Sequence, residues 1–205
     1  MEGTSVTALD HAIDYDSAAY ARANRLDPHH LRQVAEAFPD LTGMHLLEVG
    51  CGRGHLLRVI QDAGARASGV DLNPQAIAQG EADDMAVASA THLPFPDAHF
   101  DGLVSVHAIE HLPDLDTALA EMVRVVRPGG RIVLIYPAEP IQGIWAVPTA
   151  VILHRNPFKA RQVHCQKLTP KRLRTRLADL PVTVRYERFR WRGWPQYTSV
   201  LDRHG

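Results

Sequence analysis

The sequence contains few cysteines, two among its 205 residues. Cys51 and Cys165 lie far apart, so they provide no disulfide framework of the kind that holds small secreted domains together. A low cysteine content is typical of proteins from a reducing compartment, and we expect a cytoplasmic location. We interpret Cys51 as a small residue tolerated in a crowded turn rather than as a reactive thiol.

Long apolar runs are also missing. The longest one, residues 141–153, is interrupted by Gln142, Gly143 and Pro148 and is too short to cross a bilayer. The N-terminus has no basic segment followed by an apolar one, so we expect no signal peptide and no transmembrane segment. At 45% hydrophobic and 22% charged residues, the composition is that of an ordinary soluble protein, which favours a single domain over residues 1–205.

A strong net charge is absent too, because 22 basic and 23 acidic residues give a formal charge of −1. The distribution is nevertheless uneven, since residues 151–205 are rich in Lys and Arg and the rest of the chain is acidic. We interpret the basic run 171–176 as the solvated face of a helix whose Leu173, Leu177 and Leu180 face the core. An acidic or phosphorylated substrate, nucleic acid or a membrane surface remain alternative partners for this region.

What the sequence does contain is a glycine-rich turn, Glu48-Val-Gly-Cys-Gly-Arg-Gly54, between the apolar run 44–49 and an amphipathic segment, 54–63. This order predicts a buried strand, a turn and a helix, which is where α/β sheets bind nucleotide-like ligands. The third glycine comes one position too early for the G-x-G-x-x-G pattern, because His55 stands there, so a pyrophosphate loop is disfavoured. Alternating glycines instead let the backbone approach a flat adenosine and an amino-acid tail.

A second marker is the segment Arg66-Ala-Ser-Gly-Val-Asp71, which predicts a strand that ends in a carboxylate. Pro74 follows it, near the first position of the next helix. At this distance after the glycine turn, Asp71 is placed to accept hydrogen bonds from both hydroxyls of a ribose. The two motifs together favour an adenosine-containing ligand more strongly than either does alone.

The glycine turn resembles the first motif of class I S-adenosylmethionine-dependent methyltransferases, in particular their UbiE-like, type 11 small-molecule branch. The resemblance continues through residues 91–97, 100–114 and 127–135, and it covers about Met44 to Pro137. It implies S-adenosyl-L-methionine as the cofactor. The implied cofactor contacts are Glu48, Gly50, Cys51, Gly52, Gly54, Asp71, Leu72, Ser89, Ala90, Thr91, Ser105 and Tyr20.

One position departs from the family pattern. Ser89 stands where the family usually has an acid that accepts the adenine amino group. A neutral hydroxyl makes a weaker bond than a carboxylate, so we expect adenine binding to depend more on packing and on the backbone of Ala90.

Two histidines are candidate catalytic residues, each as a substrate contact or as a base that removes a proton from the acceptor. His107 follows the expected fourth strand, where the resemblance places residues that face the methyl group. His164 lies near the end of the segment 138–166. A surface histidine, or one whose hydrogen bonds are satisfied internally, is the alternative interpretation of both.

The run His107-Ala-Ile-Glu110-His111 also matches the H-x-x-E-H pattern of zinc enzymes. Pro113 follows closely, so barely one helical turn is available, and the sequence indicates no third ligand. We therefore expect no metal and interpret Glu110 and His111 as a structural pair that closes a strand–helix turn.

Strands that alternate with helices predict a Rossmann-like, doubly wound α/β sheet, mostly parallel, with helices on both faces. Strands are expected near 44–49, 66–71, 84–88, 101–106 and 131–136. Helices are expected near 54–63, 74–80 and 114–127. A further helix from about 169 to 179 should precede a final antiparallel hairpin over 182–190 and 195–202. The expected divisions are an N-terminal helical cap (1–40) that closes over the cofactor, a cofactor-binding core (44–137), an inserted lid (138–166) and a C-terminal helix and hairpin (167–205).

The expected function is methyl transfer to a small molecule, with O- or C-methylation ahead of N-methylation. Nucleobase amines are disfavoured, because Ser105-Val-His107-Ala stands where related enzymes have Asn-Pro-Pro-Tyr-type residues. Alternatives are a methyltransferase for an anionic, lipid or RNA substrate, a catalytically silent partner protein with this fold, and a nucleotide-dependent oxidoreductase. We expect a monomer or homodimer. The residues Trp145, Phe158, Trp191 and Trp194 indicate either an apolar acceptor pocket or core packing.

Overall fold

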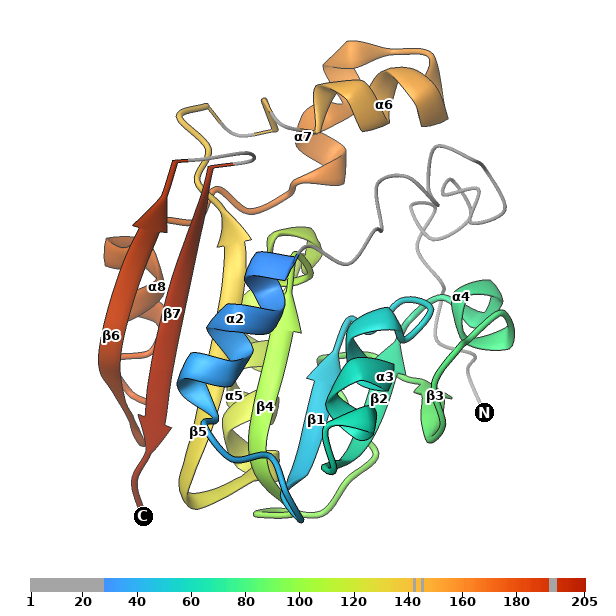
Figure 1. Ribbon diagram of the computed structural model, residues 1–205. Helices are drawn as coiled ribbons and strands as arrows, with labels where there is room; N and C mark the ends of the chain where they lie inside the picture. The colour runs from blue at the N-terminus through green and yellow to red at the C-terminus, as the bar shows by residue number, and fades with distance from the viewer. Residues whose placement is uncertain (1–27, 142, 145, 192–194) are drawn as a thin grey trace, which may run out of the picture.

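The computed structural model describes residues 28–141, 143–144, 146–191 and 195–205. In this part of the chain a seven-stranded sheet has the order β3-β2-β1-β4-β5-β7-β6 (Figure 1). The strands are β1 (His45–Val49), β2 (Arg66–Asp71), β3 (Met85–Val87), β4 (Phe100–Val106), β5 (Val126–Pro137), β6 (Val182–Arg190) and β7 (Gln196–Arg203). The first five pair in parallel, whereas β7 is antiparallel to both β5 and β6. The predicted fold class, with its antiparallel final hairpin, is confirmed.

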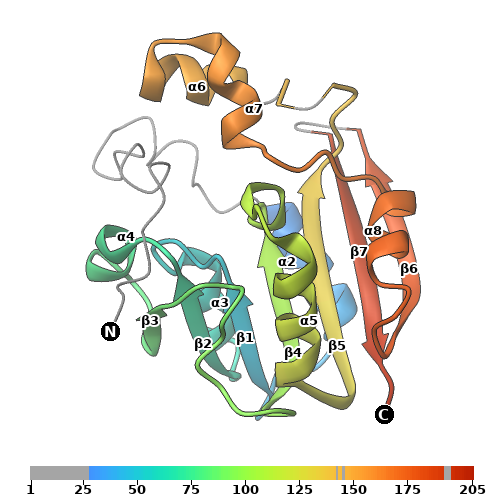
Figure 2. The ribbon, with the colours of Figure 1, turned by 180° about the vertical axis from the view of Figure 1, so that it is seen from behind.

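Helices cover both faces of the sheet. The helices are α2 (Pro28–Ala37), α3 (His55–Asp62), α4 (Pro74–Ala78), α5 (Leu115–Val125), α6 (Val147–His154), α7 (Ala160–Val163) and α8 (Pro170–Arg176), with short 3₁₀ turns η1 (Ile109–His111) and η2 (Pro157–Lys159). Helices α2 and α3 lie on one face, and α5 and α8 on the other (Figures 1 and 2). Alternation along β1 explains this, since Leu46 packs in the cluster that contains α2 and α3, whereas Leu47 packs with α5 and α8.

The boundary between α5 and β5 differs from the prediction. The helix was expected to reach about residue 127, with a strand from 131, but α5 ends at Val125 and β5 begins at Val126. Val126 already pairs with Phe100 of β4, and the register then shifts before Gly102 pairs with Arg131. Residues 127–130 therefore form an irregularity inside the strand. Gly130 fits there because an added Cβ would lie 2.7 Å from the carbonyl oxygen of Asp101.

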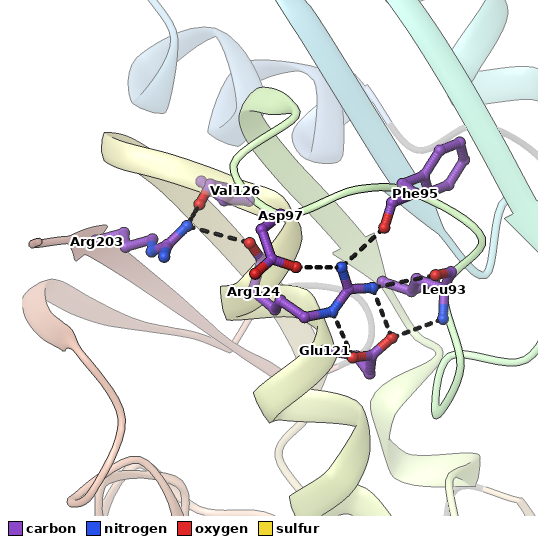
Figure 3. Close-up of polar contacts among 7 residues, drawn as sticks. All are labelled: Leu93, Phe95, Asp97, Glu121, Arg124, Val126 and Arg203. Atoms are coloured by element: carbon purple, nitrogen blue, oxygen red, sulfur yellow. Dashed lines mark hydrogen bonds and ion pairs between the residues drawn. The ribbon is translucent and has the colours of Figure 1, made fainter.

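Arg124, near the end of α5, holds the loop between β3 and β4 (Figure 3). Its guanidinium donates to the carbonyl oxygens of Leu93 (3.1 Å) and Phe95 (2.8 Å) and to the carboxylates of Asp97 (2.8 Å) and Glu121 (2.6 and 2.9 Å). The backbone amide of Leu93 donates in turn to Glu121, at 2.8 Å. One side chain thus fixes the loop that follows Ser89-Ala90-Thr91.

The basic C-terminal region has the predicted helical arrangement. On α8 and just after it, Leu173 and Leu177 are buried, while the flanking basic side chains of Lys171 and Arg172 are exposed. Several arginines of this region pair with acids elsewhere, including Arg176 with Asp116 at 2.6 Å. The positive charge is therefore partly neutralised within the fold.

The segment 138–166 follows β5 and contains α6, η2 and α7, which lie beyond the carboxyl ends of β4 and β5 (Figures 1 and 2). This is the place expected for an inserted lid. Of the expected N-terminal cap, α2 belongs to the described part, whereas Tyr20 lies outside the described residues. Among the helices of the described ranges, none is both long and apolar enough to cross a membrane.

Candidate active site

The glycine turn and the loop after β4 meet at the point where the strand order reverses. Strands β1 and β4 are neighbours, but the chain continues from β1 to one edge of the sheet and from β4 to the other. Such a switch point opens a crevice outside the carboxyl ends of the strands. Gly50 has φ +78°, and a Cβ there would lie 2.4 Å from the Cβ of Ala108, so the close contact between the two loops requires glycine.

Asp71 braces the glycine turn from the end of β2. Its carboxylate accepts from the backbone amides of Gly52 at 2.8 Å and Asn73 at 2.9 Å. Asn73 caps α4, because its side chain accepts from the first amides of that helix. Each carboxylate oxygen has a second lone pair, so Asp71 keeps the capacity to accept ribose hydroxyls while it holds the turn.

Glu48 lies beneath the turn and is 4% exposed. Burial, reinforced by the carboxylate of Asp71, raises the pKa of Glu48 to about 8. Within the described residues, its Oε2 atom has no hydrogen-bond partner. A buried carboxyl oxygen that lacks a donor is suited to a ligand that brings one. Burial also raises the pKa of Cys51, which agrees with the interpretation of this residue as an unreactive thiol.

Three predicted cofactor contacts lie on the loop after β3. The hydroxyls of Ser89 and Thr91 are 2.7 Å apart, and the amide of Thr91 donates to Ser89 at 3.2 Å. Ala90 between them is buried, packed against the core. The Ser89 hydroxyl therefore closes a local turn. Leu72, after β2, is 43% exposed and remains accessible to a ligand.

Ser105 was expected to contact the cofactor, but its side chain is fully buried. Its hydroxyl donates to the carbonyl oxygen of Val49 at 3.0 Å, which ties β4 to the end of β1. The Ser105 hydroxyl is thus engaged within the protein, and its contact with the cofactor stays a prediction.

His107 stands at the end of β4 with φ +51°, an uncommon conformation for a residue other than glycine. Its Nε2 lies 3.2 Å from Oε1 of Gln196, and its Nδ1 lies 3.4 Å from Oε1 of Glu110. The ring also contacts that of His30, which approaches the same Gln196 oxygen at 3.2 Å. Sequence reasoning missed His30 and Gln196, since they come from α2 and β7 and carry no motif.

His164 lies beside His111 rather than at the end of β4. The two rings are 4.9 Å apart in an edge-on arrangement, and Nδ1 of His164 is 2.8 Å from Oε1 of Glu139. Together with Glu110, these two histidines offer ligand atoms that lie within 4.8 Å of one another. The structure thus supplies the third side chain that the sequence did not indicate, from a segment far along the chain.

Glu110 is the buried centre of this group, with its side chain 1% exposed. Burial alone would raise its pKa, but the hydrogen bond from His107 and the nearby rings of His111 and His164 outweigh burial, so the pKa of Glu110 is lowered. Its Oε2 atom has no hydrogen-bond partner among the described residues.

The aromatic residues do not form an enclosed pocket in the described part of the chain. Phe158 is 90% exposed and Trp191 74% exposed, so these two side chains belong neither to the core nor to a closed cavity. Trp145 and Trp194 lie outside the described residues.

The chain is similar to known methyltransferases over the part that contains the glycine turn and the loop after β4. Residues 47–134 match the family described as a methyltransferase domain. O-methyltransferase resE of Aspergillus sclerotiorum is 31% identical over 114 residues, which are 50% of this chain and 43% of that protein. Malonyl-(acyl-carrier protein) O-methyltransferase of Yersinia pestis is 36% identical over 132 residues, 62% of this chain and 48% of that protein. The chain therefore spans about half the length, or less, of these relatives.

Solved structures agree on the fold. A putative methyltransferase, in complex with the Haloferax volcanii Trm112 methyltransferase activator, superposes with a TM-score of 0.69 at 17% identity, over 92% of this chain and 96% of that one. The 4+2 cyclase SpnF superposes with a TM-score of 0.69 at 18% identity, over 86% and 81% of the two chains. Residues 47–134 therefore form a methyltransferase domain, and the relatives that match over this part of the chain are methyltransferases.

Proposed function

We propose that this chain transfers a methyl group from S-adenosylmethionine to a small-molecule acceptor, with oxygen or carbon as the favoured acceptor atom. The observation that carries the proposal is the glycine turn at the switch point, braced by Asp71 through the amide of Gly52. The names of the relatives support it, since both methylate oxygen. The fold alone does not support methyl transfer, because a cyclase has the same fold.

The residues of the turn fit this cofactor. Gly50 has no side chain where a Cβ would strike Ala108, and the Oε2 of Glu48, which has no hydrogen-bond partner in the described ranges, can accept from a polar ligand group. We assign the ribose to Asp71, the adenine to the loop Ser89–Thr91, and the amino-acid tail to the turn Glu48–Gly54. Leu72 would cover one side of the bound adenosine.

The cofactor, when bound, supplies a methyl group that its sulfonium already activates, so the protein has to align the acceptor, exclude water and remove a proton where the acceptor carries one. His107 is the residue to which we assign proton removal. Both of its ring nitrogens face oxygens, so it can donate to both only as the imidazolium. To act as a base, His107 needs one ring nitrogen without a proton. The contact of that nitrogen with Glu110 or Gln196 must therefore break, so that the nitrogen can face the acceptor.

The acceptor site is proposed to lie between the switch point and the segment 138–166. A shallow cavity of about 400 Å³ in that segment is lined by apolar side chains, among them Ile144, Val147 and Phe158. Such a lining suits an acceptor with an apolar body. We further propose a cytoplasmic monomer or homodimer that does not act on nucleic acid, because both cysteines are free and several arginines of the basic region are paired with acids.

A calorimetric comparison tests the cofactor assignment. S-adenosylhomocysteine should bind, and NADH should not. Gly50→Ala should abolish binding, because it adds both strain and a clash with Ala108. Gly43→Ala is the matched control, since Gly43 also has a positive φ (+72°) but has no atom within 4 Å of an added Cβ. Binding of NADH without S-adenosylhomocysteine would contradict the proposal.

Transfer itself is tested with S-adenosylmethionine that carries a labelled methyl group and a panel of apolar hydroxy acids, phenols and quinols. Label should appear on oxygen or carbon of at least one compound, and Gly50→Ala should prevent it. Tight binding of S-adenosylhomocysteine without transfer to any compound would favour the catalytically silent partner instead.

A further inference from the structure

We propose that Glu110, His111 and His164 form a binding site for one divalent transition-metal ion, of the kind that prefers imidazole and carboxylate ligands, such as Zn²⁺. The three side chains come from η1 and from the residue after α7, and their candidate ligand atoms lie within 4.8 Å of one another. Two imidazoles and one carboxylate are a common set for Zn²⁺ and for Fe²⁺.

The carboxylate carries the first argument. Glu110 is buried, and its Oε1 is approached by His107 at 3.4 Å and by His111 at 3.9 Å, whereas its Oε2 has no hydrogen-bond partner among the described residues. A buried carboxylate oxygen without a donor is costly, and a bound cation would remove that cost.

The second argument is the contact between His164 and Glu139. Glu139 is buried and lies 2.8 Å from Nδ1 of the imidazole, so Nε2 on the other side of the ring would be the ligand atom. The other carboxylate oxygen of Glu139 accepts from the amide of Gly143 at 3.0 Å, which fixes the carboxylate. Metal-binding histidines commonly have their second nitrogen held by a carboxylate in this way.

The third argument is that the backbone already holds the two segments together. Two residues after His164, the amide of Gln166 donates to the carbonyl oxygen of Glu110 at 3.0 Å, and the Gln166 side chain donates to that of Leu112 at 3.0 Å. Bonds to Zn²⁺ of about 2.0–2.2 Å bring ligand atoms to roughly 3 Å from one another, so side-chain rotations are sufficient to close the site.

A bound ion would connect the segment 138–166 to the loop after β4 at a position next to His107. Three protein ligands leave at least one coordination position for water or for an acceptor oxygen. The metal site does not depend on the proposed methyl transfer, and its test does not measure transfer.

The test uses untagged protein from which metal has been removed with a chelator. Titration with Zn²⁺, and with Co²⁺ followed by visible absorption, should give one tight site per chain. His111→Ala, His164→Ala and Glu110→Gln should each weaken metal binding at least tenfold. Glu139→Gln should weaken it by about 10–100-fold.

His55→Ala is the matched control and should leave the metal affinity unchanged. His55 faces Glu81 at 3.1 Å and does not belong to the three-residue group.

Circular dichroism establishes that each variant is folded. Should the variants fail to fold, X-ray absorption of the wild-type Co²⁺ complex gives the answer without them, since it should show two imidazoles and no sulfur. The proposal is overturned if the wild-type protein binds neither ion, if His111→Ala and His164→Ala keep full affinity, or if the spectrum shows a sulfur ligand.

Discussion

The ring of His107 and the side-chain amide of Gln196 are joined at 3.2 Å, although one follows the end of β4 and the other begins β7, 89 residues later. The same Gln196 oxygen lies 3.2 Å from His30 of α2. The orientation of His107 is therefore set by three elements that are far apart in the sequence. This arrangement holds the imidazole at the mouth of the crevice, where we assign it to proton removal.

We expect His107→Ala to lower turnover by about 10²–10⁴-fold, the usual contribution of a positioned base, and to leave the affinity for S-adenosylhomocysteine nearly unchanged. Gln196→Ala should have a smaller effect, because it loosens the ring without removing it. The measurement is methyl transfer to a working acceptor. His204→Ala, which alters an exposed histidine near the C-terminus, is the control. Full turnover in His107→Ala would mean that the base lies elsewhere or that none is used.

Asp71→Ala is expected to weaken cofactor binding by about 1.5–3 kcal/mol, since hydrogen bonds to a charged group are of that size. Part of the loss comes from the turn, because the amides of Gly52 and Asn73 lose their acceptor. Asp71→Asn keeps the shape of the side chain, so its affinity for the cofactor should lie between those of the wild type and Asp71→Ala. Calorimetry with S-adenosylhomocysteine gives the affinities, and unchanged values in folded variants would remove Asp71 from the site.

Glu48 should make the stability of the free protein depend on pH. Its pKa is about 8 in the folded chain and about 4.5 in the unfolded one, so between these values the folded state holds a proton that the unfolded state has released. The free energy of unfolding should therefore fall as the pH rises through that window. Glu48→Gln removes this titration. Urea denaturation from about pH 5 to about pH 8 should therefore show a shallower fall of the free energy of unfolding in this variant than in the wild type. An identical fall in both proteins would show that Glu48 is ionised when folded.

Arg124→Ala should destabilise the protein by about 1–3 kcal/mol, because the carbonyl oxygens of Leu93 and Phe95 and the carboxylate of Glu121 lose their donor together. Arg124→Lys should recover little, since an ammonium group cannot reproduce the planar fork. Urea denaturation measures both. Arg127→Ala is the comparison, because Arg127 is mostly exposed and pairs with Asp101 alone among the described contacts, and it should cost less than about 1 kcal/mol.

The sequence was sufficient to predict the fold class and the sequence of strands and helices along residues 44–137, because these follow from local patterns. The apolar run before Gly50 and the helix expected near 114–127 depend on neighbours within a few residues. The start of β5 could not be predicted in the same way. Val126 joins the strand through its pairing with Phe100, which is a contact across the sheet.

The candidate site was predictable where a backbone turn defines it and not where side-chain direction does. Gly50 and Asp71 are recognisable from their spacing alone. The position of Ser105 in a strand does not reveal that its hydroxyl bonds to the carbonyl oxygen of Val49. His164 approaches His111 through a non-local fold contact, so no spacing rule could have connected them.

The position of β7 between β5 and β6 has a consequence for protein synthesis. Strand β6 leaves the ribosome before β7 and has no neighbour in the sheet until β7 emerges, while β5 presents an unpaired edge whose Ile132, Val133, Leu134 and Ile135 are all fully or nearly fully buried in the finished protein. Such an edge can pair with other chains during the interval. The folding chain is thus most exposed to aggregation until β7 has inserted between β5 and β6.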